Sequence, residues 1–159
     1  MIPIQNTVIK NVVDPGSIAT TTSSAAFDCL NARHATILYR VAPVTAATST
    51  AQMATLEILE SDGTSAAISN ASLIAAFTGT TATVTTSTAQ FLISAGNSGT
   101  GLLYKFDINM LPPRKRFLYV RQAAGSTNDR VVSSVAILSR LNDTPVNASE
   151  AGVSVLQIG

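Results

Sequence analysis

The sequence predicts an all-β fold: an antiparallel, jelly-roll-like β-sandwich of about eight strands, in one domain of 159 residues. Short segments alternate apolar and polar residues with the period of two that a β-strand imposes. Clusters of Gly, Pro, Asn, Asp and Ser separate these segments and predict turns. No segment has a convincing amphipathic helical period. This excludes a parallel sheet with crossover helices and favours a sandwich or jelly roll.

Four strands are predicted in the first part of the chain. Gln5–Val13 forms the first, and Asp14-Pro15-Gly16 ends it as a turn, because Pro presets φ and Gly accepts the left-handed conformation. Ser17–Phe27, rich in Ser and Thr, is a second and mostly solvated strand. Arg33–Val41 alternates Ala, Ile, Tyr and Val with His, Thr, Leu and Arg, which predicts one buried face. Gln52–Glu60 brings Ala, Leu and Ile onto one face in the same way.

The middle of the chain is less regular. Ala66–Phe77 is predicted to be an irregular excursion with one helical turn, because it is rich in Ala and its apolar residues are widely spaced. Thr80–Thr86 is rich in β-branched residues and is predicted to be a strand. Phe91–Ile93 extends that strand or forms a separate short one, and Ser94–Gly101 is a loop.

The segment 101–140 has the clearest patterning and predicts three strands. In Leu102–Asn109 one face is apolar and the other mostly polar, so one face is expected in the core and one in water. Lys115–Ala123 carries apolar residues on both faces, which predicts a position well inside a sheet. Val131–Arg140 behaves similarly. Residues 1–11 and 141–159 are expected to be short extended arms.

Composition narrows the class of protein. Charged residues make up 12% of the chain against a typical value of about 25%, and the net charge of +1 argues against nucleic acid as a partner. Ala, Ser and Thr supply 60 of the 159 residues, so the surface is expected to be weakly charged and covered by neighbouring proteins. Met1–Asn6 does not resemble a signal peptide, and no apolar run approaches the roughly 20 residues of a membrane span. We therefore expect a soluble protein made in the cytoplasm, with no membrane partner.

Residues that carry enzyme chemistry are scarce. His34 is the only histidine and Cys29 the only cysteine, too few for a zinc site and with no third group to complete a nucleophilic triad. Glu57 and Glu60 are an odd number of residues apart, so a strand would place them on opposite faces. The glycine-rich segment 94–101 precedes a strand rather than a helix that could hold a phosphate. No catalytic residue, metal or cofactor is predicted.

The basic corner, which we define as Arg114, Lys115 and Arg116, follows two prolines that prevent a continuous strand. It is interpreted as a solvated corner whose charges protect a strand end from edge pairing. A second interpretation is an anchor for carboxylates on a protein partner, since Arg offers bidentate hydrogen bonds. Nucleic acid is the least favoured partner, because three basic residues without a stacking platform make a small footprint.

Four segments together resemble the small cement or decoration proteins encoded beside the major capsid protein of tailed bacteriophages. They are VIKNVVDPGSIAT near the start, and PPRKRFLYVRQAAG, VVSSVAILSR and LNDTPVNASEAG towards the end. The resemblance covers most of the chain, although its motifs carry no chemical signature. The long Ser-, Thr- and Ala-rich loops depart from the family pattern.

The resemblance implies a jelly-roll-like sandwich that associates with itself, as a dimer or trimer, and is part of the virion. It implies binding to the outer surface of the phage head, where the protein bridges subunits of the major capsid protein and stabilises the shell. The family has no catalytic residues to transfer. The alternative is a glycan- or receptor-binding β-sandwich of a phage head fibre or tail, and a small hydrolase comes third.

Overall fold

A computed structural model of the chain describes residues 7–18, 23–43, 52–63, 71–78, 81–83, 91–92, 101–111, 114–124, 130–139 and 141. All ten regular elements in these ranges are strands, and all their pairings are antiparallel. They are β1 (Thr7–Ile18), β2 (Ser23–Asp28), β3 (His34–Val41), β4 (Gln52–Ser61), β5 (Ser72–Thr78), β6 (Thr81–Thr83), β7 (Phe91–Leu92), β8 (Leu102–Asn109), β9 (Phe117–Ala124) and β10 (Arg130–Ser139).

Eight of these strands pair in a nested order. β1 pairs with β10, β2 with β9, β3 with β8 and β4 with β5, as in one long hairpin folded at its middle. Rolling this hairpin over itself adds two further pairings, β10 with β3 and β9 with β4. The result is a jelly roll, which confirms the predicted fold class. The short strands β6 and β7 are additions that pair with β5 and β4.

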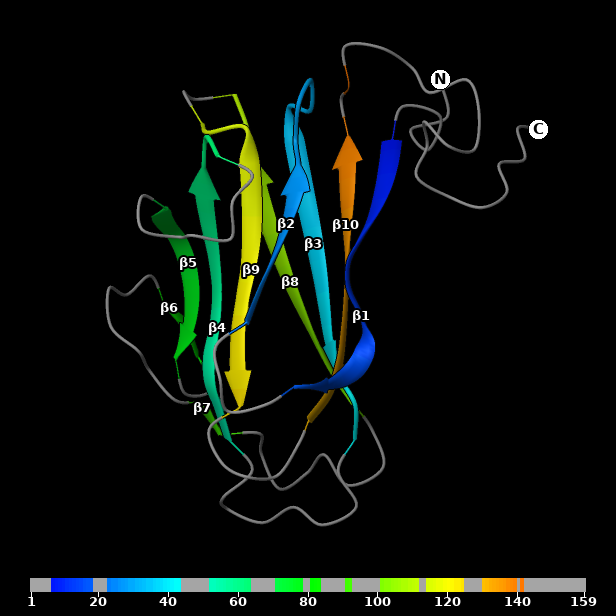
Figure 1. The fold of residues 1–159 in the computed structure, drawn as a ribbon, viewed down its shortest axis with the longest axis vertical. Helices are drawn as coiled ribbons and strands as arrows, with labels where there is room; N and C mark the ends of the chain where they lie inside the picture. The colour runs from blue at the N-terminus through cyan, green and yellow to red at the C-terminus, as the bar shows by residue number, and fades with distance from the viewer. Residues whose placement is uncertain are drawn as a thin grey trace, which may run out of the picture.

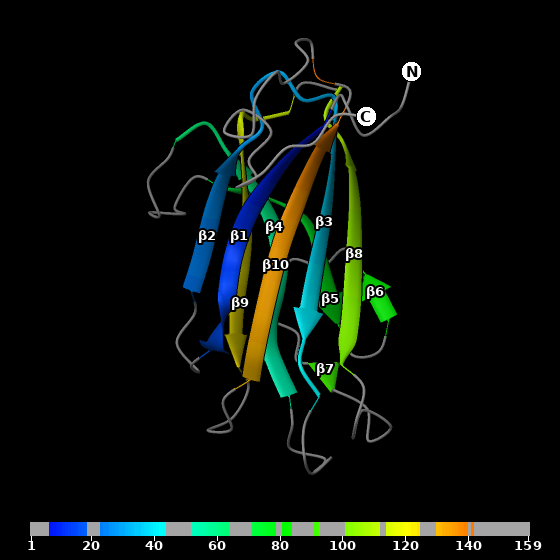
Figure 2. The ribbon, with the colours of Figure 1, turned by 90° about the vertical axis from the view of Figure 1, so that its right-hand side faces the viewer.

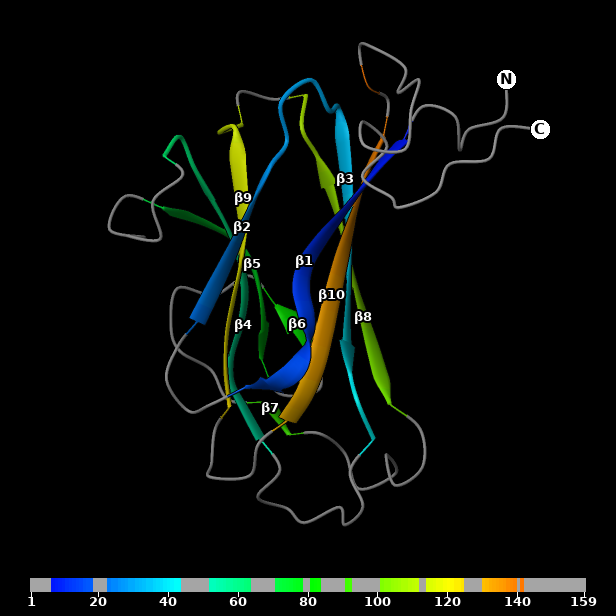
Figure 3. The same cartoon turned by 45° about the vertical axis from the view of Figure 1, so that its right-hand side comes forward.

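The strands form two sheets that face each other. Sheet A has the order β1-β10-β3-β8, and sheet B has the order β2-β9-β4-β5-β6 with β7 also on β4. The two sheets are separate layers in Figure 3, and Figure 1 shows their strands running along the longest axis of the molecule. Figure 2 looks onto sheet A, with β8 at its margin.

The core lies between the sheets and follows the alternation of side chains along each strand. In β3, for example, every odd-numbered side chain is buried, whereas the even-numbered side chains lie on the outer face of sheet A. A second, smaller cluster of Leu59, Phe117 and Tyr119 lies on the outer face of sheet B. The main cluster comprises Ile18, Phe27, Cys29, Ala35, Ile37, Tyr39, Val41, Leu56, Ile58, Phe106, Ile108, Leu118, Val120, Val132, Ala136 and Leu138.

The predicted turn at Asp14-Pro15-Gly16 is wrong, because β1 continues through it to Ile18. The register of β1 on β10 shifts twice, after Asn11 and again after Val13. Such bulges accommodate a proline, which cannot donate to a ladder, and β1 is an edge strand of sheet A. Residues 7–11 are therefore part of this paired strand, which agrees with the strand predicted over Gln5–Val13 and not with the extended arm expected over residues 1–11.

The predicted irregular excursion over 66–77 is wrong in its second half, where β5 forms. Ala75 and Ala76 of β5 lie opposite Ile58 and Glu57 of β4. Pairing with β4 therefore overrides the helical preference of an Ala-rich segment. Residues 1–6, 64–70, 84–90, 93–100 and 142–159 lie outside the described residues, so most of the expected arms and long loops does too.

Candidate functional site

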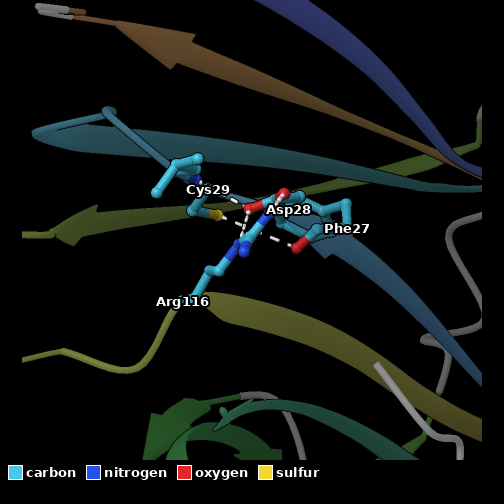
Figure 4. Close-up of polar contacts among 5 residues, drawn as sticks. Phe27, Asp28, Cys29 and Arg116 are labelled. Carbon is cyan, nitrogen blue, oxygen red and sulfur yellow. Dashed lines mark hydrogen bonds and ion pairs between the residues drawn. The ribbon is translucent and has the colours of Figure 1, made fainter. Parts of the chain in front are cut away.

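The basic corner lies at the start of β9, and its last residue is bound to β2. Nε of Arg116 lies 3.0 Å from Oδ1 of Asp28, and its Nη2 lies 2.5 Å from Oδ2. Figure 4 shows the guanidinium facing this carboxylate in a two-bond arrangement. The same guanidinium lies 5.0 Å from the centre of the Phe117 ring, a cation–π distance.

Asp28 is fixed by the turn that follows β2 as well as by Arg116. Its Oδ1 accepts a hydrogen bond of 2.9 Å from the backbone N–H of Leu30, an Asx turn. Asn31 in this turn has a φ of 68°, a left-handed conformation that Asn tolerates. The hydrogen bond from Arg116 lowers the pKa of Asp28 below its ordinary value, against the opposing effect of partial burial.

The other two residues of the basic corner contact the opposite side of β9. Nη1 of Arg114 lies 3.4 Å from Oε2 of Glu60 in β4. Nζ of Lys115 donates a hydrogen bond of 3.1 Å to Oγ of Ser72 in β5. All three basic side chains therefore have partners within the chain, and together they join the start of β9 to β2, β4 and β5.

Cys29 and His34 are separated by the fold. Cys29 is buried in the core, where desolvation raises the pKa of its thiol to about 12. Its Sγ lies 4.0 Å from the carbonyl oxygen of Phe27 (Figure 4). His34 begins β3 on the outer face of sheet A, opposite Asn109 and Ser139. A thiol with so high a pKa is not a thiolate nucleophile at neutral pH.

Glu57 and Glu60 lie on opposite faces of β4, as the sequence predicts, and therefore do not form a carboxylate pair. Glu57 lies opposite Arg121 on the outer face of sheet B, and Oε2 accepts a 2.6 Å hydrogen bond from Nε of Arg121. Glu60 lies opposite Leu118, whose side chain faces the core. The ion pair of Glu57, which is buried, therefore joins β4 to β9.

The outer face of sheet A carries four of the six large apolar side chains that are exposed in the described residues: Ile9, Leu103, Val131 and Val135. A set that we call the apolar row crosses three strands: Ile9 lies opposite Ile137, and Val135, two residues along β10, lies opposite Leu38. Ile9 and Val135 are 38% and 36% exposed, and Leu103 on β8 is 65% exposed. Apolar side chains gathered on a sheet face in this way are candidates for contact with another protein.

Sequence reasoning did not find the apolar row, although its signal was present. Val131–Arg140 places apolar residues on both faces, which we took as a sign of a strand well inside a sheet, and Arg33–Val41 places Leu38 on its otherwise polar face. β10 lies between β1 and β3, but only one side of it is covered in the part of the chain that the structure describes. The apolar residues that do not face the core therefore lie on the outer face of sheet A.

No group of three or more His, Cys, Asp or Glu side chains gathers into a metal-binding arrangement within the described ranges. Those ranges also contain no helix long and apolar enough to cross a membrane.

No protein-family model and no curated protein matches this chain. Among solved structures, it is similar to dimeric latent PorU from Porphyromonas gingivalis, with a TM-score of 0.40 and 13% sequence identity. That similarity covers 90% of this chain but only 15% of PorU. At this TM-score it adds nothing to the fold or the function.

Proposed function

We propose that this protein is a non-enzymatic virion component that binds the outer surface of an assembled phage head and bridges subunits of its major capsid protein. The resemblance of its sequence to cement and decoration proteins is the starting point. The fold supports the proposal because jelly rolls are frequent among capsid and binding domains. Weak net charge and scarce charged residues suit a protein whose surface is covered by neighbours.

The observation that carries the proposal is the apolar row on the outer face of sheet A. The apolar row is a candidate contact surface for another protein, because apolar side chains gather there on a sheet face that no described segment covers. Polar residues border the row on β3 and β8: Thr36 lies opposite Ile137, and Lys105 lies opposite Leu38. A polar margin beside an apolar centre is the usual anatomy of a protein interface.

Binding of this kind stabilises the head by mass action. A protein that binds the assembled shell but not its free subunits adds about RT ln(1 + [L]/Kd) per site, or about 2.7 kcal/mol at 100 times Kd. Heads that lack the protein should therefore open at a lower temperature than decorated heads of the same geometry.

Sedimentation with purified phage heads tests both the proposed function and the apolar row as the docking face. Val135→Glu places a charge in the apolar row and should abolish co-sedimentation, because burying an unpaired carboxylate is costly. Leu30→Glu is the matched control: Leu30 is 56% exposed, lies in the turn after β2 and is not part of the row. Equal binding of both variants would reject the apolar row as the docking face, and no binding by the unaltered protein would reject the function.

The basic corner stays a predicted contact for capsid carboxylates, but ion pairs within the chain partly neutralise its positive charge. Arg116 and Arg114 already face Asp28 and Glu60. Lys115→Glu leaves both of these ion pairs in place, so it tests the corner with least disturbance of the fold. It should weaken head binding most at low salt, since exposed charges are screened over about 10 Å at 0.1 M salt. Unchanged binding at every salt concentration would show that the basic corner does not contact the capsid and only joins strands within this chain.

Glycan binding is the alternative function, and the same purified protein can be used to test it. Jelly rolls also occur in lectins, so the purified protein should be applied to a glycan array. Specific glycan binding together with failure to sediment with heads would replace the capsid proposal.

A further inference from the structure

The outer edge of β8 is the longest regular strand edge that has no neighbour among the described strands (Figure 2). Its pairing with β3 runs without a register shift from Leu102 to Asn109. The opposite edge of sheet A, β1, is interrupted by two register shifts and by Pro15. Bulges and prolines protect an edge from pairing with another chain, whereas β8 has neither.

The backbone of β8 has hydrogen-bonding groups directed at this edge. The N–H of Met110 donates a 2.9 Å bond to the carbonyl of Arg33, towards β3. Successive residues of a strand point these groups to alternate sides, so the even-numbered residues of β8 bond to β3. The N–H and C=O groups of Leu103, Lys105, Asp107 and Asn109 therefore point outward.

The side chains at this edge form a self-complementary charge pattern. Nζ of Lys105 lies 2.7 Å from Oδ2 of Asp107, and these side chains are 59% and 46% exposed on the outer face of sheet A. Oγ1 of Thr36, opposite on β3, donates a 2.7 Å hydrogen bond to Oδ1 of Asp107, which fixes the position of this carboxylate on the outer face of sheet A. One positive and one negative group thus lie on either side of Phe106.

We infer that β8 pairs antiparallel with β8 of a second copy of this chain about a two-fold axis at Phe106. This register places Lys105 opposite Asp107 of the partner subunit, and the symmetry repeats the contact. It also keeps outward side chains opposite outward side chains, as an antiparallel pair requires. Two four-stranded sheets become one continuous sheet of eight strands. The inference does not depend on the proposed capsid function.

The charge pattern selects this register over its neighbours. A shift of the axis to residue 105 sets two lysines opposite each other, and a shift to residue 107 sets two aspartates opposite each other. Like charges directly opposite on paired strands are destabilising, whereas opposite charges stabilise the pair. Because the two-fold axis is perpendicular to the sheet, the apolar rows of both copies would face the same side.

Analytical ultracentrifugation of the unaltered protein and three variants tests this dimer. Lys105→Asp and Asp107→Lys each replace two attractive contacts with two repulsive ones, so each should raise the dimer dissociation constant at least about tenfold. A mixture of the two single variants restores opposite charges across the pair and should form a heterodimer. The double variant Lys105→Asp/Asp107→Lys should dimerise again on its own. Circular dichroism and melting temperature show whether each variant remains folded.

The mixing experiment separates the inference from a general structural defect, because a misfolded variant is not rescued by a second altered chain. Heterodimers in the mixture, with both single variants monomeric alone, support the β8 pairing. If the unaltered protein stays monomeric up to millimolar concentration, the inference is overturned, and the two charges serve only to protect the edge from pairing. Unchanged association of both single variants would also overturn it, by moving any self-contact to another surface.

Discussion

The hydroxyl of Tyr39 donates a 2.5 Å hydrogen bond to Oε1 of Gln122, and this bond crosses the core from sheet A to sheet B. Both residues are buried, and burial raises the pKa of Tyr39 well above its ordinary value. The neutral hydroxyl is thus the form that joins the two layers. A buried polar pair of this kind restricts how one sheet can slide over the other.

Tyr39→Phe should lower the free energy of unfolding by about 1–3 kcal/mol, because it leaves the buried Gln122 amide without this partner. Chemical denaturation measures the change. Gln122→Leu in the same background should recover much of the loss, since replacing both partners by apolar groups removes the unpaired atom. Equal stability of the double and single variants would contradict this account.

Ser134→Ala should raise the free energy of unfolding, by about 1 kcal/mol. Oγ of Ser134 is buried on β10 without a hydrogen-bond partner in the part of the chain that the structure describes, and burying an unpaired hydroxyl is unfavourable. Ser133→Ala, on the half-buried opposite face of the same strand, is the control and should change stability by less than about 0.5 kcal/mol. A loss of stability in Ser134→Ala would show that the hydroxyl has a partner.

Gly101→Ala should lower the free energy of unfolding by about 1–3 kcal/mol, as expected for overpacking. A Cβ at Gly101 would lie 2.5 Å from the backbone oxygen of Val41, so the end of β3 would have to move. Gly63→Ala is the control, because the nearest atom to its Cβ is Oγ of Ser61 at 4.0 Å. The melting temperature of Gly101→Ala should be clearly lower than that of Gly63→Ala. Equal melting temperatures would contradict the steric explanation.

Acid should weaken the contact between Asp28 and Arg116. The folded-state pKa of Asp28 is lowered from its ordinary value of 3.8, so the stabilisation is complete above that value and is lost as the pH falls through the lower folded-state pKa. The melting temperature of Asp28→Asn should therefore lie below that of the unaltered protein at neutral pH and approach it below about pH 4. Asp62→Asn, at an exposed position after β4, is the control. A difference that persists unchanged at pH 2 would contradict the linkage.

Alternation along the chain was enough to predict the faces of the main strands. In β8, Phe106 and Ile108 are buried while Lys105 and Asp107 are exposed, and β9 has apolar clusters on both faces, as its sequence predicts. These features depend on residues that are neighbours in sequence. Local patterning therefore carries the fold class and the orientation of each strand.

Pairing between strands was not predictable from the same patterns, because partners are remote in sequence. The consecutive strands β8, β9 and β10 do not pair with one another at all. The partners of the basic corner are equally remote: Asp28 is 88 residues from Arg116, and Glu60 is 54 residues from Arg114. Sequence reasoning located the corner but not the carboxylates that face it.

The central position of β10 has a consequence for biosynthesis. β1 leaves the ribosome before every other described strand, yet its pairing partner β10 is the last described strand to be made. Until Arg130–Ser139 emerges, β1 and β3 have no strand between them, and β9 must likewise appear before β2 and β4 can be joined. Each layer can thus close only after its central strand has been translated, long after its first strand, and until then the nascent chain carries open strand edges that chaperones or other nascent copies can contact.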